Sequence, residues 1–252
     1  MTKLTIPSHP LLLLLLLVLG GTQAAAFVTK HHHHHHHSAF SRPTTTTTTA
    51  TTTALPAKSG NMGCRPIGIG SAAPATIITN ADLEAVMETS DEWIKSRTGI
   101  AQRHVLVQQE TLRDLGVQAA KNALAMAGVD AADLDVVICA TSSPDDMFGD
   151  APSIAAQLGC TTETVAFDLT AACSGFLFGI VTAGKFLNGS NTKALVIGAD
   201  ALSRWVDWDD RNSCILFGDG AGAMVLESSD APGILGYAAH SNGKGYGDLN
   251  CG

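Results

Sequence analysis

Cys173 is the residue of this chain best placed to act as a nucleophile. It stands in the run 170–176 (TAACSGF), between an apolar segment, 165–169, and a mostly apolar segment, 176–187. The pattern indicates strand, tight turn and helix, with Cys173 in the first helical turn. There the unpaired N–H groups and the helix dipole favour a thiolate by about 0.3–1 kcal/mol, and the small neighbours leave the sulfur open to a substrate. A lone cysteine is more often a small core residue, so local context leaves both roles open.

Trp93, Arg97 and Arg211 are a second set of residues whose types suit binding. A Trp with Arg side chains beside it can stack a purine ring and hold phosphate groups. The alternative is a half-buried Trp with two solvated Arg side chains, and spacing alone favours that alternative. Both interpretations stay open on these residues alone.

Two further motifs resemble functional sites but have simpler explanations. Residues 218–223 (GDGAGA) resemble a phosphate-binding loop, yet residues 224–227 (MVLE) indicate a strand, and no Lys-Ser or Lys-Thr pair follows. We therefore expect a glycine turn between two strands. His240 and Asn242 would complete a Cys-His-Asn set with Cys173, but the glycine-rich segment around them predicts a solvated turn.

The segments that must position these residues show strand patterns and helix patterns in alternation. Continuous apolar runs such as 136–140 predict strands covered on both faces, and repeated strand–helix units predict an α/β fold with a mostly parallel sheet and helices on both faces. The predicted strands are 66–70, 136–140, 165–169, 194–198, 214–217, 222–227 and 233–240. The predicted helices are 81–88, 91–97, 112–127, 153–158 and 173–187, the third with Leu112, Leu115, Ala119, Ala123 and Met126 on one face.

Polar residues and glycines mark the expected helix ends. Asn80 is expected to cap the helix over 81–88, and Thr89 with Glu92 forms a capping-box pattern before the helix over 91–97. Glycines are expected to end three helices: Gly99, Gly128 and Gly159.

The first 63 residues differ in composition from the rest. Lys3, the apolar run 11–19 and the small residues after it predict a signal peptide over residues 1–26, because the run is too short to span a membrane. Residues 27–63 hold seven consecutive His, two Thr runs and no acid, which is typical of a low-complexity transit peptide. Such a two-part leader resembles that of algae whose plastids lie inside the secretory system. We therefore expect the plastid stroma as location, with no stable membrane association.

The remainder of the chain is acidic and contains all six cysteines. All 23 Asp and Glu lie from Asp82 onward, and with 10 of the 15 Lys and Arg they give the part after residue 80 a net charge of −13 (10 − 23), which argues against nucleic acid as a partner. The six cysteines show no C-x-x-C pair and no zinc-like spacing. We expect a reduced compartment, no disulfides and no defined metal site.

Taken together, residues 64–252 resemble beta-ketoacyl-acyl carrier protein synthase III, the condensing enzyme of the thiolase superfamily that starts type II fatty acid synthesis. The resemblance implies a thiolase-like α/β fold, a layered mixed sheet with helices on both faces. It covers about residues 67–249, and the first two of its motifs, in this order and at this separation, are highly specific. The motifs are 89–100 (TSDEWIKSRTGI) with Arg103-His104, 167–176 (FDLTAACSGF), Asp210-Arg211 with 217–223 (FGDGAGA), and 240–249.

The resemblance also assigns roles to individual residues. Cys173 is similar to the sulfur that takes an acyl group, usually acetyl, from coenzyme A before condensation with malonyl-acyl carrier protein. Trp93 and Arg211 resemble the pair that sandwiches the adenine, with Arg97 and Thr98 at the nucleotide end. Phe148 resembles the aromatic that reaches across a homodimer interface to bound the partner's acyl pocket. The resemblance implies no permanently bound cofactor, since the coenzyme A thioester is a substrate.

One departure from the family pattern qualifies these roles. The family has two similar halves, and its second half supplies a catalytic His and Asn, whereas this sequence ends at Gly252, soon after the first half. His240 matches a different His-x-x-Gly loop, so it receives no catalytic role. We therefore expect acylation without condensation from the sequence as given. The alternatives are a non-catalytic half-synthase that binds coenzyme A or pairs with a full-length relative, and a related enzyme that makes polyketides or hydroxymethylglutaryl products.

Overall fold

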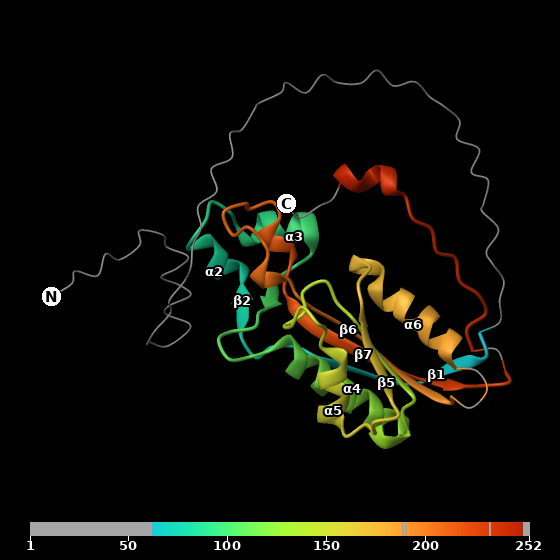
Figure 1. The fold of residues 1–252 in the computed structure, drawn as a ribbon. Helices are drawn as coiled ribbons and strands as arrows, with labels where there is room; N and C mark the ends of the chain where they lie inside the picture. Colours follow the sequence, from blue (N-terminus) through green and yellow to red (C-terminus); the bar gives the residue numbers. More distant parts are fainter. Residues whose placement is uncertain (1–61, 188, 190, 232, 249–252) are drawn as a thin grey trace, which may run out of the picture.

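A five-stranded mixed sheet forms the centre of the fold (Figure 1). The computed structural model describes residues 62–187, 189, 191–231 and 233–248. The predicted signal peptide, and all of the predicted leader except residues 62 and 63, lie outside the described residues. In spatial order the strands are β1 (Cys64–Ala72), β7 (Asp219–Ser228), β6 (Lys193–Ala201), β4 (Val136–Ala140) and β5 (Val165–Leu169).

The direction of the strands differs from the mostly parallel sheet that was predicted. β4 pairs in parallel with β5 and β6, but β7 is antiparallel to both β6 and β1. β4, β5 and β6 are connected through helices, as parallel neighbours require. β7 instead follows β6 through a segment of short turns, 202–218, and so returns beside β6 in the opposite direction. The layered mixed sheet implied by the family resemblance is confirmed.

Helices cover both faces of this sheet. Helices α4 (Leu112–Ala127) and α5 (Ala151–Leu158) lie on one face, and α6 (Gly175–Phe186) lies on the other (Figure 1). Along β4, Val137 and Cys139 belong to the α4–α5 core, while Val136 and Ile138 belong to the α6 core. Every residue of β4 is therefore buried, as its continuous apolar run predicted.

The helix over 112–127 forms within the predicted bounds, but its buried face is rotated. Ala119, Ala120 and Ala123 are fully buried against the sheet, whereas Met126 is 64% exposed and the prediction that placed it in the core is wrong. The small alanines allow close approach to β1, because ideal Cβ atoms at Gly68 and Gly70 would lie only 2.4 and 2.3 Å from carbonyl oxygens of α4. A larger residue such as Met126 fits the helix edge instead.

A smaller group of elements adjoins the sheet. It consists of the hairpin of β2 (Ile77–Thr79) and β3 (Gln102–His104) with helices α2 (Asn80–Glu84) and α3 (Asp91–Thr98). Two predicted caps are wrong by one residue: Thr79 caps α2 in a capping box with Asp82, and Ser90 caps α3. The glycine helix ends are confirmed, since Gly99, Gly128 and Gly159 each adopt the left-handed conformation after a helix.

Two predicted strands are absent from the described residues. Cys214–Leu216 forms the 3-10 turn η4 rather than a strand, and within 233–240 Ile234 and Tyr237 make isolated bridges rather than a strand, that of Ile234 being to Met62. The helix predicted from Cys173 begins at Gly175, after the 3-10 turn η2 (Ala172–Ser174). The other 3-10 turns are η1 (Ala131–Asp133), η3 (Leu202–Arg204) and η5 (Gly243–Asp248). Of the helices described, none is long and apolar enough to cross a bilayer.

Candidate active site

The turn between β5 and α6 presents Cys173 to the surface. β5 ends at Leu169, Ala172 then adopts a left-handed φ of 46°, and Cys173 follows in η2 with an exposed side chain. A left-handed conformation at a residue with a Cβ costs of the order of 1–3 kcal/mol and is concentrated at functional turns. Such a turn at the start of a helix is the arrangement that the sequence predicted for a nucleophile.

Close packing of α6 on the sheet fixes the position of this turn. An ideal Cβ at Gly179 would lie 2.7 Å from Val196 Cγ1, and one at Gly175 would lie 3.2 Å from Ala140 Cβ. These glycines let the helix backbone approach β6 and β4 more closely than any other residue would allow. The start of α6, and with it Cys173, is therefore set by the sheet.

Cys173 borders a hollow of about 380 Å³. Its other walls come from the ends of β4 and β6, from the segment at the start of β7, and from Phe176 of α6. The lining residues are Ala140, Ala172, Cys173, Phe176, Gly198, Ala199, Asp200, Gly218, Gly220 and Gly222.

The glycines of the 218–223 motif have a role that the sequence did not predict. Gly220 lies inside β7, paired with β6, rather than in a turn between two strands, while Gly222 is a strand residue as predicted. Gly218 packs directly on β3, since an ideal Cβ there would lie 2.9 Å from His104 O and 3.0 Å from Arg103 Cβ. The absence of side chains at these positions leaves space for the hollow beside Cys173.

Cys173 differs from the other described cysteines in its exposure. Cys64, Cys139 and Cys214 are buried, and burial raises the pKa of each thiol. Cys160 is partly exposed, and its pKa is also raised by burial. Because the thiolate is the reactive form, these four are poor nucleophiles. Cys251 lies outside the described residues.

Trp93, Arg97 and Arg211 form one cluster, as required for nucleotide binding. The Arg97 and Arg211 guanidinium carbons lie 4.4 and 4.6 Å from the centroid of the Trp93 ring. Arg211 also donates a hydrogen bond from Nη1 to the carbonyl of Glu88, which holds the turn that carries Arg211 beside α3. The structure therefore joins an aromatic ring and two cations from distant parts of the sequence.

Thr98 lies in the last turn of α3, the helix that also carries Trp93 and Arg97. Its hydroxyl donates to Ile94 O at 2.8 Å and accepts from Ile100 N at 3.0 Å. The hydroxyl thus shapes the end of the helix. The predicted contact of Thr98 with a nucleotide stays a prediction.

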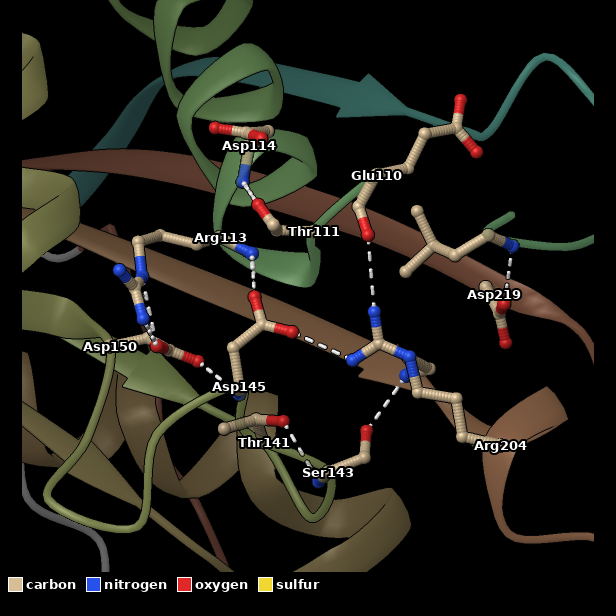
Figure 2. Close-up of polar contacts among 12 residues, drawn as sticks. Glu110, Thr111, Arg113, Asp114, Thr141, Ser143, Asp145, Asp150, Arg204 and Asp219 are labelled. Carbon is tan, nitrogen blue, oxygen red and sulfur yellow. Dashed lines mark hydrogen bonds and ion pairs between the residues drawn. The ribbon is translucent and has the colours of Figure 1, made fainter. Parts of the chain in front are cut away.

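A network of carboxylates holds the segment 141–149, which carries Phe148 (Figure 2). Asp145 accepts from Arg204 Nη1 at 2.7 Å and from Arg113 N at 2.8 Å. Asp150, nearly fully buried, accepts from Arg113 Nε and Nη2 at 3.0 and 2.9 Å. Burial alone would raise the pKa of Asp145, but the hydrogen bonds it accepts from Arg204 and from backbone N–H groups outweigh that effect and lower it.

Phe148 itself projects from this anchored segment into solvent, with 88% of its surface exposed. It borders a second hollow of about 580 Å³ beside β5, the edge strand of the sheet. The neighbouring Met147 is also 88% exposed. The role of Phe148 at a homodimer interface stays a prediction.

Other polar residues near the site could not be singled out from the sequence. Asp200 borders the hollow and accepts from Ser142 N at 2.8 Å and Ser143 Oγ at 3.1 Å. Asp219 accepts from Leu106 N and Ser203 N at 2.7 and 2.9 Å. Asp200 lies near the end of β6 and Asp219 begins β7, which is the only local signal of a role at the sheet edge.

His240 and Asn242 do not line the hollow beside Cys173. Both side chains are exposed, and Asn242 Oδ1 accepts from Lys244 N at 3.2 Å in a local turn. In the described part of the chain, no group of three or more His, Cys, Asp or Glu is placed to hold a metal ion.

Comparisons with known proteins point to one family. Residues 167–243 match the family model of 3-oxoacyl-acyl-carrier-protein (ACP) synthase III. A beta-ketoacyl-acyl-carrier-protein synthase III of Synechococcus sp. (strain WH7803) is 56% identical over 190 residues, which cover 75% of this chain and 56% of the relative. The chain thus spans little more than half the length of the curated relatives it matches.

Solved structures give the same result. The crystal structure of 3-oxoacyl-acyl-carrier-protein synthase III from Aquifex aeolicus VF5 is 44% identical with a TM-score of 0.64, over 67% of this chain and 55% of that chain. The priming beta-ketosynthase from the R1128 polyketide biosynthetic pathway is 35% identical with a TM-score of 0.64, over 67% of this chain and 51% of that chain.

Proposed function

Over the length that it spans, the chain belongs to the beta-ketoacyl-acyl carrier protein synthase III family, and we propose that it takes an acyl group from a coenzyme A thioester onto Cys173. The observation that carries this proposal is the exposure of Cys173 beside the hollow, at the strained turn before α6. In the complete protein, the acyl group is then condensed with malonyl-acyl carrier protein to start type II fatty acid synthesis.

The acylation step needs one nucleophile and a place for the developing negative charge. The Cys173 sulfur attacks the thioester carbonyl, and the carbon–sulfur bond to coenzyme A breaks as the acyl group becomes attached to Cys173. Coenzyme A leaves as its thiol with the proton that Cys173 gives up. Thiols suit both stages, because sulfur is a good nucleophile and a good leaving group. The backbone N–H of Cys173 is the proposed donor to the oxyanion.

The Trp93 cluster is the proposed site for the nucleotide end of coenzyme A. An adenine ring is held between Trp93 and the Arg211 guanidinium, which moves off the Trp93 ring that it covers in the structure, while Arg97 supplies positive charge for phosphate groups. The backbone links this cluster to the hollow, because Gly218 of the hollow packs on β3 of the smaller group of elements. The flexible pantetheine arm of coenzyme A connects the two sites.

The condensation step belongs to the proposal for the complete protein. Malonyl-acyl carrier protein loses carbon dioxide, and the resulting carbanion attacks the thioester on Cys173. The family resemblance attributes the His and Asn that support this step to a second half of the protein, and the relatives extend well beyond the part that matches this chain. We also propose a homodimer with Phe148 at its interface, and a plastid location for the protein.

A second candidate function is priming of polyketide synthesis. The priming beta-ketosynthase named above is 35% identical to the chain over 67% of its length, which supports the same chemistry with another starter. The two candidate functions differ in the acyl group that the protein accepts. The test measures transfer of acetyl, butyryl and isobutyryl groups from their coenzyme A thioesters to the protein. Preference for acetyl supports fatty acid initiation, preference for a longer or branched group supports the second candidate, and transfer of none refutes both.

A further inference from the structure

Arg103 is a buried cation without a carboxylate partner. Its side chain is 5% exposed, and none of the ion pairs among the described residues includes it. Burial lowers the pKa of its guanidinium from the ordinary value. Because a buried charge normally has a compensating ion, the position of Arg103 calls for a reason beyond packing.

The hydrogen bonds of Arg103 join three separate elements. Nη1 donates to Ile78 O of β2 at 3.2 Å, and Nη2 donates to Ile215 O of η4 at 3.2 Å. Nη2 also donates to Asn80 Oδ1 at 3.0 Å, at the start of α2. The planar fork of a guanidinium can reach several acceptors at once, which a Lys ammonium on a flexible stem cannot do in the same geometry.

Asn80 extends this connection to α3. Its side chain is 1% exposed, and Nδ2 donates to Asp91 Oδ1 at 2.9 Å and to Ile100 O at 2.8 Å. Asp91 is the first residue of α3, and Ile100 follows the Gly99 that ends it. Asn80 therefore contacts both ends of the helix that carries Trp93.

A continuous polar path thus runs from α3 through Asn80 and Arg103 to η4. Arg211 lies in the turn just before η4, and its guanidinium must meet a ring that α3 carries. Trp93 and Arg211 come from segments far apart in the sequence. Their separation depends on how α3 and η4 are held relative to each other.

From this path we propose that Asn80 and Arg103 are positioning residues that set the spacing of Trp93 and Arg211 for the nucleotide end of coenzyme A. The inference rests on the proposed function, because it concerns the same nucleotide site. It adds that affinity for the nucleotide depends on two buried residues that do not touch it. Reaction at Cys173 with a thioester that lacks the nucleotide does not depend on them.

Two conservative variants test the proposal in the 252-residue chain. Arg103→Lys keeps the charge and the Cβ that packs on Gly218, but loses the fork. Asn80→Asp keeps an acceptor for Arg103, but removes the donors to Asp91 and Ile100 and places two carboxylates together. Matched controls make the same chemical changes elsewhere: Arg65→Lys at the exposed Glu227 ion pair, and Asn122→Asp at the exposed hydrogen bond from α4 to Ser71 O of β1.

The assay compares acetylation of Cys173 by acetyl-CoA and by acetyl-N-acetylcysteamine, which lacks the nucleotide. Coupling through buried contacts is typically worth 2- to 30-fold, so we expect both test variants to raise the half-saturating acetyl-CoA concentration by about 10-fold. The rate with the short thioester is expected to change by less than about twofold, and both controls to behave as wild type.

Four other results contradict the proposal or the proposed function on which it rests. If the test variants leave half-saturation by acetyl-CoA unchanged, Asn80 and Arg103 do not position the clamp. If they slow both thioesters equally, their role is general stability of the fold. If the wild-type chain reacts with the short thioester but shows no saturation by acetyl-CoA, the proposed nucleotide site fails and this inference with it. If wild type reacts with neither thioester, the proposed function fails.

Discussion

Gly179→Ala is the substitution whose effect on the nucleophile follows most directly from the packing of α6. The added Cβ would lie 2.7 Å from Val196 Cγ1 on β6. An ordinary carbon–carbon contact is about 3.5–4.0 Å, so the helix must move by about 1 Å away from the sheet. Cys173 precedes this helix directly and moves with its first turn.

The size of the effect combines two opposing contributions. Overpacking of a tight core contact costs about 1–3 kcal/mol, while replacing glycine by alanine inside a helix recovers about 0.5–1 kcal/mol. The net loss in the free energy of unfolding is therefore about 0.5–2 kcal/mol. A nucleophile displaced by about 1 Å loses up to about 100-fold in rate, so acylation of Cys173 is expected to slow by about 10- to 100-fold.

Gly184→Ala is the matched control on the same helix. Its Cβ would lie 2.9 Å from the sulfur of the flexible Met62 side chain and 3.2 Å from the sulfur of Cys64, near the end of α6 that lies away from Cys173. Urea unfolding and the rate of Cys173 acetylation are measured for both variants. If Gly179→Ala unfolds and reacts like wild type, the sheet does not fix Cys173 through this glycine. Equal losses of stability and of acetylation rate in both variants would refute the same reasoning.

Further predictions concern reactivity, acid stability and the anchored segment. Iodoacetamide at pH 8 is expected to modify Cys173 and to spare the buried cysteines, whose pKa is raised by burial; peptide mapping that finds a buried cysteine labelled in the folded protein contradicts this. Asp145→Asn is expected to lower the free energy of unfolding near pH 7 by about 1–2 kcal/mol through the Arg204 bridge. Because the pKa of Asp145 is lowered on folding, this difference is full above about pH 4 and disappears as the pH falls through the folded pKa, which urea titrations at several pH values check. Gly149→Ala is expected to lower the thermal midpoint of unfolding, because position 149 has a φ of 96° and the new Cβ would lie 3.0 Å from the Asp168 carboxylate. An unchanged midpoint of unfolding argues against strain at this position.

Elements with strong local signals could be predicted from the sequence. The apolar run 136–140 forms a buried strand, and the helix over 112–127 ends at Gly128, because a continuous apolar run and a left-handed glycine act within a few residues. The α/β class follows from the same signals. The side of a helix that faces the core is less local, and Met126 was misplaced for that reason.

Elements that depend on distant partners could not be predicted. The sequence predicts a turn at Gly220, but pairing with β6 makes it a strand residue. The residues of η4 have the composition of a strand, yet they form a 3-10 turn in which the Ile215 carbonyl accepts a hydrogen bond from Arg103. In both cases the competing contact comes from a segment far away in the sequence.

The candidate site divides in the same way. The exposure of Cys173 and its turn followed from small residues between two apolar runs. The family motifs paired Trp93 with Arg211, whose guanidinium lies 4.6 Å from the Trp93 ring, while the adenine sandwich stays a prediction. Asn80 and Arg103 carry no local signal of their role. Their importance appears only when the hydrogen bonds that join α3 to η4 are traced.

The attachment of an acyl group to Cys173 is the central claim, and peptide mapping by mass spectrometry after incubation with acetyl-CoA tests it most directly. If Cys173 takes the acyl group, the peptide that contains Cys173 carries one acetyl group, and Cys173→Ala carries none. Neutral hydroxylamine removes the acetyl group, as expected for a thioester. A folded chain, verified by circular dichroism, that carries the acetyl group on another residue or on none would contradict the account.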